Sequence, residues 1–267
     1  MKKNHKTVAA LVVMLVSLVA VPAQAMTVSA NSNAAALANL FGGNGVSITN
    51  ATLSTASSTA AGTFTGAASA IGFDSGLLLT TGTVDCAVGP NTVANCYGTG
   101  QTTSLAFDFE SASGNLFFNY VFASEEYPEF VGTRFNDSFE LLLNGVNIAL
   151  LPDMTTVVAI NNINSDKNAQ YYRSNSDGSL DTQYDGLTTV LTAQATGLTG
   201  VNHFELRIAD VGDAIFDSGV FLQAGTFSAT PSAPLSDVPE PASLALIGLG
   251  VAGIAAARRK RAMSKAA

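Results

Sequence analysis

The chain has 267 residues, of which 20 are acidic, 12 are basic and 47% are hydrophobic. Eight of the basic residues lie among the first six residues or after Ala257, so residues 26–238 keep four basic and 19 acidic residues and a net charge of −15. A body this acidic repels the phosphates of nucleic acid, so we expect no nucleic-acid partner. The charge suits cation binding or solubility outside the cell, and about 210 residues suffice for one domain with one core.

The first 25 residues have the three parts of a secretory signal peptide. Three lysines stand in the first six positions, an apolar run covers residues 7–21, and the small residues Ala23 and Ala25 follow. Signal peptidase recognises small residues in this arrangement. We therefore predict a signal helix at residues 1–25 that is removed after Ala25, which makes Met26 the first mature residue. The alternative is an uncleaved membrane anchor.

The body has the pattern of short strands separated by turns, with one short helix expected at residues 34–40. Strand patterns cover residues 77–80, 105–109, 116–123, 139–143, 146–150, 156–160, 187–195, 204–208 and 219–227. Asn144-Gly145 predicts a hairpin with a type I′ turn. Many short strands with little helix predict an all-β fold, a jelly-roll-like β-sandwich over residues 26–228.

Cys86 and Cys96 are the only two cysteines and lie ten residues apart in a stretch that contains Gly, Pro and Asn. Outside the cell, a disulfide that closes this loop is the favoured interpretation. A metal pair is less favoured, because no histidine accompanies the two cysteines.

His203 is the only histidine left after the signal is removed. It begins an alternating strand and shares a face with Glu205 and Arg207, which predicts a solvated sheet face rather than a catalytic base. No nucleophile elbow or zinc-binding helix motif occurs in the chain. We therefore predict no catalytic residue.

Carboxylates gather in two loops that follow strands. Glu125, Glu126 and Asp137 belong to the first, and Asp210, Asp213 and Asp217 belong to the second. Carboxylates at close range repel one another unless a cation joins them or some remain protonated. Oxygen ligands without histidine or thiolate select Ca²⁺.

We therefore predict a calcium site built from Glu125 or Glu126 with Asp137, Asp210 and Asp213, and with Asp217 in reserve. The alternative is that these carboxylates accept hydrogen bonds from the loop backbone or only solvate the surface.

Several strings of the body resemble the choice-of-anchor L domain family. They are residues 76–82, 89–91, 121–127 (VFASEEY), 135–137 (FND), 184–189 (YDGLTT) and 208–213 (IADVGD). The resemblance spans about residues 35–228 in the expected order. It implies an extracellular β-rich domain that precedes varied surface anchors, and it supplies no catalytic activity.

The chain ends in a linker and a membrane-type tail. Residues 229–237 are rich in Pro and Ser and form a spacer. In residues 238–262, the triplet Pro239-Glu240-Pro241 precedes an apolar run of 16 residues, 242–257, and a basic cluster that includes Arg258 and Arg259. The run is at the short limit for a transmembrane helix, and the basic cluster would stay in the cytoplasm.

This order of three parts resembles the PEP-CTERM sorting signal. The resemblance implies recognition of Pro239, Glu240 and Pro241 by exosortase, with Arg258 and Arg259 in the basic end. It also implies a Gram-negative host that makes exopolysaccharide, and transient anchoring in the inner membrane. The alternative is a plain tail anchor.

We expect a non-enzymatic protein of the cell surface or extracellular matrix, acting in adhesion or in exopolysaccharide and biofilm binding with Ca²⁺ as a cofactor. Its expected partners are signal peptidase, exosortase, and exopolysaccharide or other surface proteins. The alternative is a secreted carbohydrate-active hydrolase that uses two loop carboxylates about 5 Å apart or wider. Such a hydrolase would have to stack sugars on Tyr127, Tyr171 and Tyr172, because the chain has no Trp.

Overall fold

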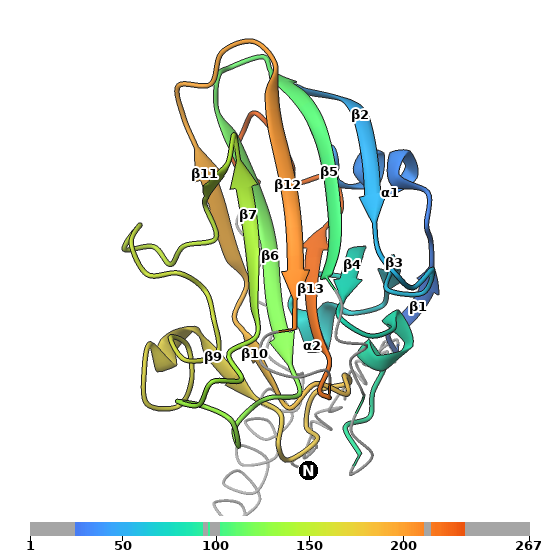
Figure 1. Ribbon diagram of the computed structural model, residues 1–267, viewed down its shortest axis with the longest axis vertical. Coiled ribbons are helices and arrows are strands. Elements are labelled where there is room, and N and C mark those ends of the chain that lie inside the picture. Colours follow the sequence, from blue (N-terminus) through green and yellow to red (C-terminus); the bar gives the residue numbers. More distant parts are fainter. Residues whose placement is uncertain (1–24, 93–95, 97–101, 211–214, 233–267) are drawn as a thin grey trace, which may run out of the picture. The chain divides into compact units, whose positions relative to one another are not determined.

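A computed structural model describes residues 25–92, 96, 102–210 and 215–232 of the chain (Figure 1). Residues 1–24 of the predicted signal peptide and the predicted C-terminal transmembrane helix lie outside these ranges. Among the helices within them, none has the length and apolar character needed to cross a membrane.

The described part forms two antiparallel sheets and a few short helices. The larger sheet contains β1 (Thr27–Ala30), β3 (Ala61–Thr65), β4 (Gly76–Thr80), β13 (Ser218–Gln223), β6 (Leu116–Ser124), β10 (Gly186–Thr188) and β9 (Tyr172–Ser174) in that order, and β11 (Leu191–Ala195) also pairs with β6. The smaller sheet has the order β2 (Val46–Ser54), β5 (Thr102–Ser111), β12 (Asn202–Ala209), β7 (Ser138–Leu143) and β8 (Val146–Asn147). The helices are α1 (Ala34–Phe41), α2 (Ala68–Ile71), and the 3₁₀ turns η1 (Val84–Ala87) and η2 (Ala169–Tyr171).

The strand connections are those of a jelly roll. From β4 onwards the chain changes sheet at nearly every step: β5 lies in the smaller sheet, β6 in the larger, β7 and β8 in the smaller, β9 to β11 in the larger, β12 in the smaller and β13 in the larger. The row β4–β13–β6–β11 thus packs on the row β5–β12–β7–β8 with antiparallel pairing throughout, as in double-sheet jelly rolls. The predicted all-β sandwich is confirmed.

Aromatic rings fill the space between the sheets near Leu116, the first residue of β6. Phe227 lies within 5.5 Å, between ring centroids, of Phe41, Phe107, Phe118 and Phe204. These side chains are buried, and aromatic pairs of this kind add about 0.5–1.5 kcal/mol each beyond the burial of their area.

The central strands of the larger sheet are buried on both faces. Phe122 of β6 packs between the sheets, whereas its neighbour Val121 and Phe221 of β13 pack in a second core with Phe64 and Ile71. This second core lies under α2 and η1, which supply several of its side chains. Burial on both faces explains why residues 116–123 of β6 are apolar at almost every position, with Asn119 as the exception, instead of alternating.

Local sequence signals account for the predicted helix and hairpin. Helix α1 begins after Asn33, whose side-chain oxygen accepts a hydrogen bond from the Ala36 N–H at 3.0 Å. Asn144 and Gly145 both have positive φ, 50° and 82°, as a type I′ turn requires. The second strand of this hairpin is shorter than predicted, because the Asn147 side chain accepts the N–H of Leu141 and so replaces the next ladder bond.

The strand predicted at residues 156–160 is wrong. Val157 makes only an isolated bridge to Leu150, and the segment continues as turns. Val158 and Ile160 are apolar because their side chains enter the core between the sheets, without pairing in a ladder. A buried loop and a buried strand give the same apolar run.

The strand predicted at residues 187–195 is two strands, β10 and β11. Thr189 and Val190 separate the two strands, and the Thr189 N–H donates to the Tyr171 carbonyl at 2.8 Å, in continuation of the β9–β10 pairing. Both strands pair with β6, β10 with its last residues and β11 with its first part.

Candidate functional site

The structure brings the predicted carboxylates to one end of the sandwich. Glu125 and Glu126 follow β6, Asp210 follows β12, Asp137 precedes β7 and Asp217 precedes β13. Because β6 pairs antiparallel with β13, and β12 with β7, the ends of β6 and β12 meet the starts of β13 and β7 (Figure 1). Asp213 lies outside the described residues.

Four of these side chains are almost completely buried, and we call them the carboxylate cluster. The exposed fractions are 2% for Glu125, 1% for Glu126, and 0% for Asp137 and Asp217. The alternative that they solvate the surface is therefore wrong for these four. Buried carboxylates need hydrogen bonds, protonation or a cation to offset the loss of water.

Asp217 is held by hydroxyl groups. Thr81 Oγ1 donates to its Oδ1 and the Tyr184 hydroxyl donates to its Oδ2, both at 2.9 Å. Its backbone N–H donates to the Cys96 carbonyl at 3.1 Å, and its carbonyl accepts from the Glu125 N–H at 3.0 Å. Burial raises the pKa of Asp217 to about 7, although the hydrogen bonds from Tyr184 and Thr81 oppose the rise.

Asp137 is held by a serine pair on the two neighbouring strands. The Ser218 hydroxyl lies 2.7 Å from both Asp137 Oδ2 and Ser124 Oγ. A hydroxyl has a single hydrogen, and the carboxylate is the stronger acceptor. Ser124 Oγ also accepts the N–H of Glu126 at 3.0 Å, so the pair fixes the turn that carries the glutamates.

Glu125 differs from the other members of the cluster. Within the described part of the chain, neither of its carboxylate oxygens has a hydrogen-bond partner. Burial, together with the negative charges of Asp185, Asp217 and Glu129, raises the pKa of Glu125 to about 9. This carboxyl is therefore protonated and neutral at pH 7.

The described residues do not form the predicted calcium site as a complete ligand set. Among them, no three His, Cys, Asp or Glu side chains lie close enough together to hold a metal ion. Asp213 lies beyond what the structure describes, so the calcium hypothesis stays a prediction.

Cys86 and Cys96 form a disulfide with their Cα atoms 5.5 Å apart. The disulfide joins Cys86 of η1 to Cys96, whose backbone carbonyl accepts the hydrogen bond from the Asp217 N–H. It therefore anchors the chain directly beside the carboxylate cluster.

Several residues of this site were missed by sequence reasoning, namely Thr81, Ser124, Tyr184, Ser218 and Gly219. A side chain at Gly219 would place its Cβ 2.5 Å from the Tyr184 hydroxyl, so a glycine is required there. Ser124 and Tyr184 lie in the strings that carry the family resemblance, and that signal could have found them.

Two of the three tyrosines considered for sugar stacking are committed to packing. Tyr127 is fully buried, donates its hydroxyl to the Ile163 carbonyl at 2.7 Å, and packs on Tyr172 with ring centroids 5.0 Å apart. Gly186 makes room for it, because a Cβ there would lie 2.6 Å from the Tyr127 ring. Tyr171 is left, and it lines a surface hollow.

That hollow has a volume of about 320 Å³ and lies beside β11 and β8. Its lining is mainly apolar and includes Pro152, Met154, Tyr171, Leu191, Thr192 and Gln194. None of its lining residues is a carboxylate, histidine or cysteine.

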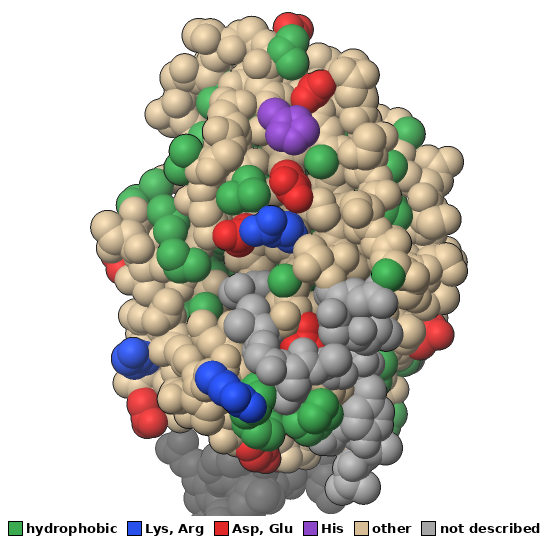
Figure 2. Space-filling model, viewed as in Figure 1, with side chains coloured by type: hydrophobic (Ala, Val, Ile, Leu, Met, Phe, Trp, Pro, Cys, Tyr) green, Lys and Arg blue, Asp and Glu red, His purple; other side chains and the backbone are tan. Residues whose placement is uncertain are grey.

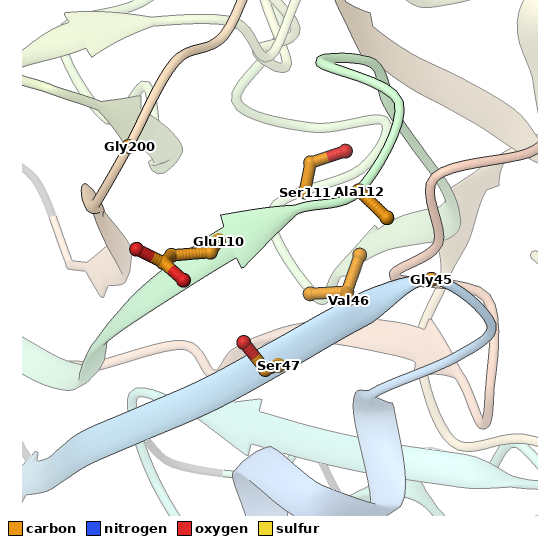
Figure 3. A pocket seen from close by; sticks show the side chains of 7 residues that line it. All are labelled: Gly45, Val46, Ser47, Glu110, Ser111, Ala112 and Gly200. Atoms are coloured by element: carbon orange, nitrogen blue, oxygen red, sulfur yellow. The ribbon is translucent and has the colours of Figure 1, made fainter.

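A second hollow, of about 490 Å³, lies where β2 begins and β5 ends (Figure 3). Figure 3 shows the side chains of Val46 and Ser47 beside those of Glu110 and Ser111 on the adjacent strand. Glu110 is the single carboxylate in its lining, so this hollow offers no acid–base pair.

The outer face of the smaller sheet is polar, as predicted for His203, Glu205 and Arg207. His203 lies 2.8 Å from Asp108, and Arg207 pairs with Glu140 of β7. Figure 2 shows acidic, basic and histidine side chains together on this face. Hydrogen bonds from Asn50 and His203 lower the pKa of Asp108. His203 and Arg207 are exposed, so the prediction of a solvated sheet face is confirmed.

The fold and the site define a class of protein, an acidic jelly-roll domain whose carboxylates are buried at one end and tied to a disulfide. Comparison with known families identifies it. The choice-of-anchor L domain matches residues 26–228, and the chain belongs to that family. No curated protein and no solved structure matches the chain.

The PEP-CTERM protein-sorting motif matches residues 237–261, which include Pro239, Glu240, Pro241, Arg258 and Arg259. The motif implies that the protein is exported, sorted to the bacterial surface and processed by exosortase. Both families concern anchoring and sorting, so the domain content suggests a non-enzymatic surface protein.

Proposed function

We propose that the domain is a non-enzymatic, surface-displayed module that binds exopolysaccharide and so acts in adhesion or in the biofilm matrix. The carrying observation is the hollow beside β11 and β8. It combines Tyr171 and apolar walls with two polar residues, Thr192 and Gln194. Sugar rings have apolar faces and hydroxyl edges, and mainly apolar sites with a few polar groups suit such ligands.

The alternative of a carbohydrate-active hydrolase receives less support from the described residues. Glycoside hydrolysis requires two carboxylates that reach the scissile bond. Glu125, Asp137 and Asp217 are buried and not available to a sugar chain, and neither hollow has two carboxylates in its lining.

The test uses the secreted protein and the exopolysaccharide of its own source bacterium. We expect Tyr171→Ala to weaken binding about tenfold or more in calorimetry, because truncating a central aromatic contact typically costs more than 1 kcal/mol. Tyr171→Phe, which keeps the ring, and Glu110→Gln, in the other hollow, are the matched controls and should bind normally. Unchanged binding by Tyr171→Ala would exclude this hollow, and release of reducing sugar by the wild-type protein would favour the hydrolase.

Calcium dependence is a finer proposal, and it rests on Glu125. A buried carboxyl without a partner, beside Asp217 and near Asp185, holds a proton that a cation could replace. Ca²⁺ would then bind more tightly as the pH rises, since it competes with that proton. Calorimetric titration at pH 6 and pH 8 tests this, with Glu125→Gln as the variant. No heat at millimolar Ca²⁺ and no rise in Tm relative to EDTA would end the proposal.

We also propose that the host is Gram-negative and that the tail anchors the protein in the inner membrane only transiently, until exosortase cleaves it. The support is the motif match together with the basic cluster at its end. Cell fractionation with C-terminal mass spectrometry tests both points. A mature surface protein that retains Arg258 and Arg259 would indicate a plain tail anchor instead.

A further inference from the structure

The first residue after the predicted signal cleavage is built into the fold. The Met26 side chain is 2% exposed and belongs to the second core together with Phe64 and Phe73. Its backbone nitrogen donates to Oδ2 of Asp181 at 3.1 Å, across 155 residues of sequence. Ala25, directly before it, is exposed. The chain therefore passes from solvent into the core at the bond that signal peptidase is predicted to cut.

Asp181 is presented by a loop with internal support. The buried Asn175 side chain donates to the Thr182 carbonyl at 2.9 Å, and Thr182 Oγ1 donates to the Ala87 carbonyl at 2.7 Å. Gly89 packs directly on Asp181, because a Cβ there would lie 2.6 Å from its Oδ1. The carboxylate is thus held in place by contacts that do not involve Met26.

Cleavage changes the chemistry of the nitrogen that meets this carboxylate. Hydrolysis of the Ala25–Met26 bond consumes one water: its hydroxyl completes the carboxyl group of Ala25 and its hydrogen goes to the Met26 nitrogen. That amine then takes a proton from solvent, because a free α-amino group has a pKa of about 7.7–8.0. A neutral amide N–H thereby becomes an ammonium with three hydrogens.

We propose that the new α-ammonium of Met26 forms an ion pair with Asp181, so that signal cleavage completes and stabilises the folded domain. A hydrogen bond between ionised partners is roughly twice as strong as one between neutral groups. The pair is partly buried, which reduces its screening by salt. The family match begins at residue 26, so the paired nitrogen is that of the first residue of the domain. This inference rests on the predicted export processing and is independent of polysaccharide binding.

Another acidic group lies on an element that packs against β1. The turn η1 packs beside β1 and carries Asp85, whose side chain is exposed. Asp85 would add to the attraction for a cation, but an exposed carboxylate contributes less than a partly buried one at hydrogen-bond distance.

The experiment compares two mature N-termini, each confirmed by mass spectrometry of the exported protein. One begins at Met26; the other has Gly-Ser inserted after Ala25, which moves the ammonium away and leaves an amide at Met26. We expect Asp181→Asn to lower Tm by about 2–4 °C more in the first protein than in the second. An equal loss in both would mean that Asp181 only accepts a backbone hydrogen bond, and would overturn the ion pair.

A second measurement uses the mature wild-type protein alone. The pKa of the Met26 α-amine is obtained from the pH dependence of its acylation, followed in the N-terminal peptide by mass spectrometry. We expect a value above that of a free chain terminus, about 7.7–8.0, because Asp181 favours the charged form. An ordinary value, or a mature chain that begins elsewhere than Met26, would overturn the proposal, whatever the protein's affinity for polysaccharide.

Discussion

The two ends of β6 are buried by opposite means. Near Leu116, the space between the sheets is filled by the rings of Phe41, Phe118, Phe204 and Phe227. Near Ser124, the same strand runs into four buried carboxylates, of which Asp137 and Asp217 are held by hydroxyl groups. One end is stabilised by apolar area and ring geometry, and the other by hydrogen bonds and protons.

The difference shows where this fold responds to its environment. Apolar packing is insensitive to pH and to cations, because nothing in it titrates. The carboxylate end holds Glu125 and Asp217, whose raised pKa values make its stability depend on proton concentration. We therefore look for regulation by pH or calcium at that end and for bulk stability at the other.

The largest effect is expected at the aromatic end. Phe118 contacts Phe41, Phe204 and Phe227, with ring centroids 5.3 to 5.5 Å apart, so Phe118→Ala should cost about 3–5 kcal/mol of unfolding free energy. Denaturant unfolding between pH 5 and pH 9 measures it. Phe118→Leu, which fills most of the cavity, should cost less. A loss that varied strongly with pH would break the contrast between the two ends.

Removal of the disulfide should have the second-largest effect on stability, and the loss of amide protection should differ between regions of the domain. Replacing Cys86 and Cys96 with Ser removes a bond between residues that are ten positions apart in the sequence. In the chain-entropy model, this loss lowers the free energy of unfolding by about 2–3 kcal/mol. Since the Cys96 carbonyl receives the Asp217 N–H, amide protection should fall first at the start of β13. Hydrogen exchange followed by mass spectrometry resolves this. Equal loss of protection in β5 would show that the loop supports the whole sandwich.

The third prediction concerns pH, with EDTA present. Because the folded pKa of Glu125 is about 9 and its ordinary value is 4.5, the folded state keeps a proton that the unfolded state releases between those values. The stability that this group contributes is full below about pH 4.5 and is lost as the pH rises towards 9, and Asp217 acts in the same sense up to about pH 7. Glu125→Gln should reduce the fall in Tm between pH 7 and pH 9 by a few degrees. Glu205→Gln, on the outer face of β12, is the control and should leave the slope unchanged.

The aromatic end of the molecule was easier to predict from the sequence than the carboxylate end. Apolar runs such as 116–123 and alternation at 204–208 are local signals, and they gave the strands and the sandwich. The run at 156–160 misled, since burial of a loop leaves the same trace as burial of a strand. That ambiguity is inherent in periodicity alone.

The structure places Glu125, Asp137 and Asp217 at one end of the sandwich, but their burial and hydrogen bonding were not predictable from the sequence. Tyr184 and Thr81, which hold Asp217, are distant in sequence and belong to no ion-binding pattern. Burial of Glu125 depends on how β6, β10 and β13 meet, which is a property of the assembled sheet. Spacing along the chain indicated a cluster but gave neither its depth nor the protonation of its members.

The smallest effect is expected on the outer face of the smaller sheet, where charges are paired in solvent. Arg207 on β12 and Glu140 on β7 form an ion pair between adjacent strands. A double-mutant cycle with Arg207→Ala and Glu140→Ala should give a coupling of about 0.2–1 kcal/mol that declines with added salt. The reason is that solvent already stabilises both charges, unlike the buried group on Glu125. A coupling well above 1 kcal/mol that resists salt would mean that this face is ordered like the carboxylate end, and the contrast would then lie between the sheets rather than between the ends of β6.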